Sequence, residues 1–166
     1  HASIITNNSS PQQKVLNVGF GMGIIDSILQ EMNPALHIII EAHPVVHANM
    51  IAAGWDKKEN VRICFGKWQD EIPKLIQEGI TLDGIFFDRY GEHFLDLEDF
   101  HNVIPKLLAK PNGIYSFFNG LAPDNIFFHG VGKLVLSEFE FNLEAYYIHH
   151  HLQFSPFIHN SIQYIH

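Results

Sequence analysis

The chain is poor in cysteine, in cationic residues and in long apolar runs, and each shortage excludes a class of protein. Its single cysteine, Cys64, rules out an intrachain disulfide, which is compatible with a reducing compartment. Ten Lys and Arg face 18 Asp and Glu, which argues against a nucleic-acid partner, because phosphate contacts need clustered basic side chains. No apolar run approaches the ~20 residues that span a bilayer, and residues 1–14 contain no apolar signal core. We therefore expect no membrane partner and a cytoplasmic protein, with the nucleus as a second compartment.

The chain does contain an alternation of strand and helix patterns that suits one domain. Residues 1–13 are polar and indicate a flexible lead-in, and residues 14–166 indicate a single domain. Short apolar runs predict strands, and apolar residues at helical spacing predict helices. The predicted strands are 15–18, 36–40, 61–65, 82–87 and 114–118, and the predicted helices are 24–32, 44–53, 68–77, 95–108 and 123–138.

This alternation predicts an α/β fold, doubly wound around a mostly parallel sheet with helices on both faces. The end of the chain follows a different pattern. Residues 143–154 and 161–165 have the composition of two strands with no helix between them. We therefore predict an antiparallel hairpin at the C-terminal edge of the sheet, a feature that the usual dinucleotide-binding fold lacks.

A glycine-rich loop separates the first predicted strand from the first predicted helix. It has the spacing Gly19-x-Gly21-x-Gly23, and glycine allows both a sharp turn and close approach of the backbone to a ligand. A lone glycine triplet is equally compatible with an ordinary tight turn. Glu41 ends the second strand, where a carboxylate can accept hydrogen bonds from both ribose hydroxyls, and Asp70 follows the third strand, where it can meet an adenine edge. Together these positions predict a nucleoside-containing cofactor.

The loop favours S-adenosylmethionine over a nicotinamide cofactor. Dinucleotide sites usually have the spacing G-x-G-x-x-G, and Ile24 stands where that third glycine would be. The sulfonium cofactor has no pyrophosphate to bind at the helix N-terminus, and Asp26 near that helix start would repel a phosphate. An NAD-dependent oxidoreductase is thus disfavoured by the glycine spacing and by the predicted hairpin.

Other polar and aromatic residues fall at the same end of the predicted sheet. Asp88 follows the fourth strand and Glu92 lies shortly after it, and ligands of open α/β sheets bind outside the carboxyl ends of the strands. Trp68 follows the third strand, where it has two equally supported roles, packing near an adenine ring or packing in the core.

Five motifs carry a resemblance to a known family. The chain resembles the guanidino-N-methyltransferases, and within them it is most similar to the fungal-type protein arginine N5-methyltransferases, with guanidinoacetate N-methyltransferase as a relative. The motifs are residues 19–26 (GFGMGIID), 39–44 (IIEAHP), 66–70 (GKWQD), 87–90 (FDRY) and 116–121 (SFFNGL). The resemblance extends from about residue 14 to residue 121 and becomes faint after residue 123.

The resemblance implies a Rossmann-like class I methyltransferase that moves a methyl group from S-adenosylmethionine to a guanidino nitrogen. It implies that Asp88 binds and orients the guanidinium, that Glu41 holds the ribose, and that the backbone of residues 19–23 holds the methionine end. The catalytic candidates are Asp88 and Glu92. The expected cofactor-binding residues are Gly19, Phe20, Gly21, Met22, Gly23, Glu41, Ala42, Trp68, Gln69, Asp70 and Asp88, and no metal site is expected.

The sequence departs from the family in one respect. The resemblance implies a second acidic residue from a segment before the first strand, but the first acidic residue here is Asp26. Either that segment lies outside this chain or the substrate site is incomplete, in which case Glu92 is the substitute candidate. Three functions stay open: N5-methylation of arginine in protein, methylation of guanidinoacetate or another small guanidino compound, and cofactor binding without catalysis. The oligomeric state is open as well.

Overall fold

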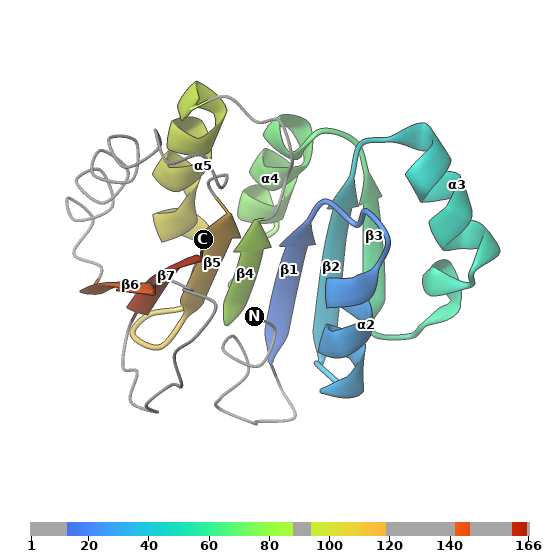
Figure 1. Ribbon diagram of the computed structural model, residues 1–166, viewed down its shortest axis with the longest axis horizontal. Helices are drawn as coiled ribbons and strands as arrows, with labels where there is room; N and C mark the ends of the chain where they lie inside the picture. The colour runs from blue at the N-terminus through green and yellow to red at the C-terminus, as the bar shows by residue number, and fades with distance from the viewer. Residues whose placement is uncertain (1–12, 88–93, 119–141, 147–160, 166) are drawn as a thin grey trace.

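The computed structural model describes residues 13–87, 94–118, 142–146 and 161–165, which form a sheet with helices on both faces (Figure 1). The strands are β1 (Lys14–Val18), β2 (Leu36–Glu41), β3 (Val61–Phe65), β4 (Gly84–Phe87), β5 (Ile114–Phe118), β6 (Asn142–Tyr146) and β7 (Ser161–Ile165). The helices are α2 (Ile24–Glu31), α3 (Pro44–Ala52), α4 (Trp68–Gln77) and α5 (Phe94–Leu107), with the short 3-10 helix η1 (Trp55–Lys57). None of the helices in this described part of the chain is long and apolar enough to cross a membrane.

The alternation of side chains along the strands divides the core between the two faces of the sheet. On one face Val15 of β1 packs with Leu29 of α2, while Ile39 of β2 packs with Met50 of α3. The opposite face carries the larger cluster, in which apolar residues of β1 to β5 pack against α4 and α5. The α/β class and the two covered faces are therefore as the sequence predicts.

The strand order places a switch point between β1 and β4. The sheet has the order β3-β2-β1-β4-β5-β7-β6, so β2 and β3 extend from β1 toward one edge while β4 and β5 extend toward the other. β1 and β4 are parallel neighbours, and Val18 pairs in register with Phe87 at their carboxyl ends. Open α/β sheets bind ligands outside the carboxyl ends at such a point. The glycine loop leaves β1 at this position.

The element bounds follow the sequence prediction closely through β5. The bounds of β3, α4 and β5 coincide with the predicted ones, and the other predicted strands and helices up to β5 begin or end one or two residues away, while η1 was not predicted. The predicted helix over 123–138 and residues 147–154 of the predicted strand lie outside the described residues.

The predicted antiparallel hairpin is wrong. β7 lies between β5 and β6 and is parallel to both. An apolar strand pattern carries no information about direction, so the sequence supported the strands without fixing their polarity. The order β5-β7-β6 still differs from the dinucleotide-binding order 3-2-1-4-5-6.

Candidate functional site

The glycine loop follows a backbone path that glycine adopts without strain. The φ angles of Gly19, Gly21 and Gly23 are 95°, 56° and 72°, and the left-handed region costs a residue with a side chain ~1–2 kcal/mol. Two backbone bonds shape the turn: Gly19 N donates to Ile40 O at 2.8 Å, and Gly23 N donates to Phe20 O at 2.8 Å. A Cβ added at Gly21 would meet nothing within 4 Å, so this side of the loop is open to a ligand.

The ring of Phe20 anchors the loop to the body of the domain. It packs edge to face with Trp55 of η1, with 5.1 Å between the ring centroids, and joins the cluster formed by Ile39 and Met50. A Cβ at Gly23 would lie 2.9 Å from Phe20 Cε1, so the ring leaves no room for a side chain there. Phe20, expected to bind the cofactor, thus directs its ring inward and supports the loop.

Glu41 joins the end of β2 to the glycine loop. Its side chain is 7 % exposed; Oε2 accepts a hydrogen bond from Phe20 N at 2.8 Å, and Oε1 accepts one from His43 N at 2.6 Å. A carboxylate offers about four lone-pair positions, so two acceptor positions remain after these bonds. Glu41 therefore fixes the loop and retains the capacity to accept hydrogen bonds from two hydroxyls.

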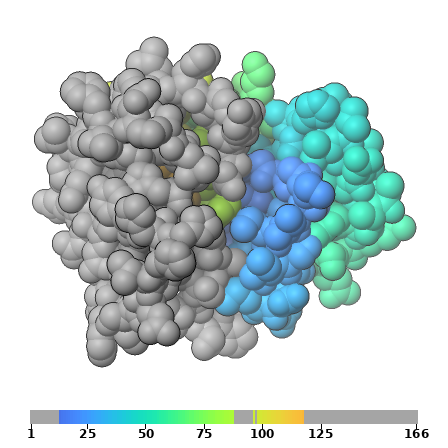
Figure 2. Space-filling model, in the orientation of Figure 1, coloured from blue at the N-terminus to red at the C-terminus, as the bar shows by residue number. Residues whose placement is uncertain are grey.

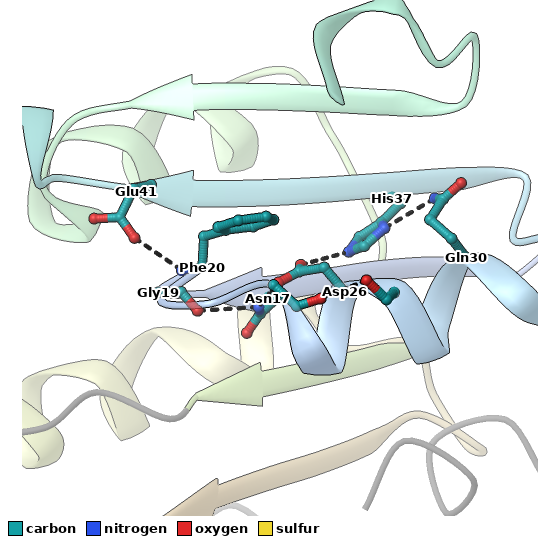
Figure 3. Close-up of polar contacts among 9 residues, drawn as sticks. Asn17, Gly19, Phe20, Asp26, Gln30, His37 and Glu41 are labelled. Carbon is teal, nitrogen blue, oxygen red and sulfur yellow. Dashed lines mark hydrogen bonds and ion pairs between the residues drawn. The ribbon is translucent and has the colours of Figure 1, made fainter. Parts of the chain in front are cut away.

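A buried polar cluster lies beneath the loop, between α2 and the sheet (Figure 3). Asn17 Nδ2 donates to Gly19 O at 3.0 Å and to Asp26 Oδ2 at 2.8 Å. Asp26 Oδ1 lies 3.0 Å from His37 Nε2, and both side chains are fully buried. His37 Nδ1 lies 3.0 Å from Gln30 Nε2. Asp26, expected to repel a phosphate at the start of α2, instead accepts a hydrogen bond from Asn17 of β1 and lies within ion-pair distance of His37 of β2, under the loop.

The remaining predicted cofactor residues have different surroundings. Met22 is 89 % exposed at the tip of the loop, where α2 and the preceding loop form part of the surface (Figure 2). Ala42 is half-buried after β2, and Gln69 and Asp70 are exposed in the first turn of α4. These positions leave their backbone or side chains accessible at the carboxyl edge of the sheet.

Trp68 lies in the core. It is 3 % exposed, and its ring packs edge to face with Phe87 and Phe100 at centroid distances of 6.2 and 5.1 Å. Its Nε1 has no hydrogen-bond partner among the described residues. The core-packing role considered for Trp68 is thus the one its ring contacts support.

The two predicted catalytic residues, Asp88 and Glu92, lie outside the described residues. The description of β4 ends at Phe87, which is a neighbour of Val18 in register. Their placement at the substrate side of the site stays a prediction.

Sequence reasoning missed three residues that support the loop: Asn17, His37 and Trp55. Asn17 and His37 interrupt otherwise apolar strands, and a polar residue buried in a strand needs a hydrogen-bond partner. A polar residue within an apolar strand pattern therefore indicates a buried hydrogen-bonded side chain, and this signal could have identified both residues. Trp55 follows Gly54 after α3, and nothing local to it predicts contact with a loop 35 residues earlier.

Comparison with known proteins relates this site to a family. The family model described as guanidinoacetate N-methyltransferase matches residues 2–127. The chain belongs to this family. Its curated relatives include protein arginine N-methyltransferase 2 of Candida glabrata, 43 % identical over 135 residues, which are 81 % of this chain and 32 % of that protein. The protein of the same name from Saccharomyces cerevisiae is 45 % identical over 123 residues, 74 % of this chain and 30 % of that protein. The chain thus spans less than a third of these relatives.

Solved structures show the same fold at low sequence identity. Fibrillarin of Aeropyrum pernix, determined with natively bound S-adenosyl-L-methionine, matches with a TM-score of 0.62 and 11 % identity over 85 % of this chain and 64 % of its own. A methyltransferase of Agrobacterium tumefaciens described as SAM-dependent matches with a TM-score of 0.60 and 14 % identity, covering 84 % of this chain and 48 % of that one. This chain therefore has the fold of the class I methyltransferases.

Proposed function

We propose that this chain carries the cofactor-binding part of an S-adenosylmethionine-dependent methyltransferase that acts on a guanidino group, with arginine in a protein as the substrate. The observation that carries the proposal is the attachment of the Gly19–Gly23 loop to Glu41 at the carboxyl ends of β1 and β2. That geometry occurs in a chain about 45 % identical to proteins named protein arginine N-methyltransferase 2.

The described residues fit the cofactor. The side of the loop at Gly21 is free of other atoms within 4 Å of an added Cβ, which gives room for a ligand to approach the backbone. Glu41 has unused acceptor positions beside the loop for the two ribose hydroxyls. When bound, S-adenosylmethionine supplies an electrophilic methyl group on a sulfonium.

The acceptor needs help from the protein. A guanidinium is a weak nucleophile because its lone pairs are delocalised and its pKa exceeds ~12, and it repels the cationic methyl donor. A carboxylate can bind the planar N–H fork with two hydrogen bonds, direct one nitrogen toward the methyl group and offset the positive charges. We assign this role to Asp88, with Glu92 as the second acidic group, since both follow β4 in the sequence.

A small guanidino substrate is the second candidate, and the description of the matching family model as guanidinoacetate N-methyltransferase favours it. A domain that binds the cofactor without catalysis is the third. The single cysteine and acidic balance support a cytoplasmic location without a nucleic-acid partner.

Calorimetric titration with S-adenosylhomocysteine tests the cofactor site. We expect saturable binding by the chain, no binding of NADH, and weaker binding by Gly21→Ala, which places a methyl group on the open side of the loop. A folded chain that does not bind S-adenosylhomocysteine at millimolar concentration would contradict the proposal. Methyl transfer from labelled S-adenosylmethionine to an arginine peptide or to guanidinoacetate then separates the candidate substrates, and binding without transfer to either supports the non-catalytic alternative.

A further inference from the structure

The polar cluster beneath the glycine loop connects three elements without reaching the ligand side. Its members come from β1 (Asn17), α2 (Asp26 and Gln30) and β2 (His37). The first three links run from Gly19 O through Asn17 and Asp26 to the ring of His37, with heavy-atom distances of 3.0, 2.8 and 3.0 Å. Figure 3 shows the chain of contacts passing from the loop to the interior of the domain.

The donors and acceptors in this chain allow only one direction of hydrogen bonding at Asn17. Both of its contacts, to Gly19 O and to Asp26 Oδ2, are made by Nδ2, and an amide nitrogen has two N–H donors. The Gly19 carbonyl and the Asp26 carboxylate can only accept, so both require that the amide nitrogen of Asn17, and not the amide oxygen, points toward them. The acceptor oxygen of Asp26 thus helps to set the orientation of Asn17.

His37 fixes the carboxylate from the other side. Gln30 Nε2 lies 3.0 Å from His37 Nδ1, and His37 Nε2 lies 3.0 Å from Asp26 Oδ1. Asp26 is 0 % exposed, and its carboxylate is held on both sides: Oδ2 accepts a hydrogen bond from Asn17, and Oδ1 lies within ion-pair distance of His37. Replacing a buried ion pair with apolar residues of similar volume is often neutral or stabilising, so stability alone is a weak reason for this pair. The orientation that the pair imposes on the Asn17 amide is a more specific reason for it.

We propose that Asp26 is a positioning residue of the cofactor site: its buried carboxylate, held by His37, orients Asn17 so that Asn17 holds the Gly19 carbonyl and with it the loop. This inference rests on the proposed cofactor site. Asp26 acts through Asn17 and touches no ligand. We therefore expect Asp26 to affect the binding of the methionine end of the cofactor, which the loop holds. Binding of the nucleoside part depends on Glu41 instead.

Two ligands separate this role from a general contribution to folding. S-adenosylhomocysteine has the amino-acid part, whereas 5′-methylthioadenosine keeps the nucleoside and thioether and lacks it. In Asp26→Leu, which has similar volume and no acceptor, we expect the affinity for S-adenosylhomocysteine to fall on the order of tenfold, the factor equivalent to ~1.4 kcal/mol. The affinity for 5′-methylthioadenosine stays within about twofold of the unmodified chain. Both dissociation constants are measured by calorimetry on the whole chain.

The conservative variant Asp26→Asn should keep the binding of S-adenosylhomocysteine that Asp26→Leu loses. Its amide oxygen can accept from Asn17 Nδ2, and the ring of His37 can present an unprotonated Nε2 to the new amide nitrogen while the Gln30 amide rotates. We expect both ligands to bind this variant within about threefold of the unmodified chain. The exposed Asp56→Asn in η1 is the charge-matched control and leaves both affinities unchanged.

An equal loss for both ligands in Asp26→Leu, or no loss for either, overturns the proposal. If Asp26→Leu does not fold, Asn17→Ala takes its place, because it removes the contact with Gly19 and keeps the Asp26–His37 pair. It must then show the same selective loss of S-adenosylhomocysteine binding. Failure of the unmodified chain to bind S-adenosylhomocysteine is a different result, and it refutes the cofactor site itself.

Discussion

Two glycine-to-alanine substitutions in the same loop should have different effects on stability. Gly21 and Gly23 both have positive φ, 56° and 72°, so alanine at either position costs ~1–2 kcal/mol of backbone strain. At Gly23 the new methyl group also lies 2.9 Å from Phe20 Cε1. Phe20 must then move away from Trp55, which adds ~1–3 kcal/mol for overpacking. We expect the free energy of unfolding to fall by about 2–5 kcal/mol in Gly23→Ala and by about 1–2 kcal/mol in Gly21→Ala.

Urea unfolding of the two variants beside the unmodified chain measures this difference. The midpoints should separate while the slopes stay the same, because neither substitution changes the surface exposed on unfolding. A third variant, Gly23→Ala with Phe20→Leu, should recover part of the loss by making room for the methyl group. Equal destabilisation by the two single substitutions, or no recovery in the double variant, would refute the packing of Phe20 against the loop.

Two further predictions concern buried titratable groups. His101 of α5 is 1 % exposed against the rings of Tyr115 and Phe117, and burial lowers its pKa from 6.5 to about 3. Between these two pH values the unfolded chain therefore carries a proton on His101 that the folded chain lacks. The free energy of unfolding thus falls as the pH drops below 6.5. Denaturant titrations should show a loss of about 2 kcal/mol between pH 6.5 and pH 5 in the unmodified chain, and a smaller loss in His101→Leu; equal losses would contradict the assignment. Burial also raises the pKa of the Cys64 thiol, so a disulfide reagent at pH 8 should modify the native chain far more slowly than the chain in denaturant, and equal rates would count against a buried thiol.

The sequence predicts the part of the fold that depends on local patterns. The bounds of β3 and α4 coincide with the prediction, because apolar spacing and flanking glycines identify such elements over a few residues. The direction of β7 was not predictable, since it depends on pairing with β5, more than 40 residues earlier in the chain.

For the candidate site, the sequence predicts the position of the loop but not its support. The glycine spacing and Glu41 indicate a cofactor loop after the first strand, and the structure places the two in contact. The partners of Asp26 depend on which strand faces α2, which is a property of the assembled sheet. Trp68 shows the same limit: its place in the sequence suits either role, and only the packing of α4 on the sheet determines where the ring lies.

The supports of the glycine loop are close together along the chain. Asn17, Asp26, His37, Glu41 and Trp55 all lie within residues 17–55, and the side-chain bonds that hold the loop join residues 2, 9 and 21 positions apart. Contacts of short sequence separation form early and at low entropic cost during folding. The first third of the chain therefore contains the glycine loop together with the residues that hold it in place. Changes in the later strands can therefore alter the rest of the carboxyl edge of the sheet without disturbing the loop that these first residues hold.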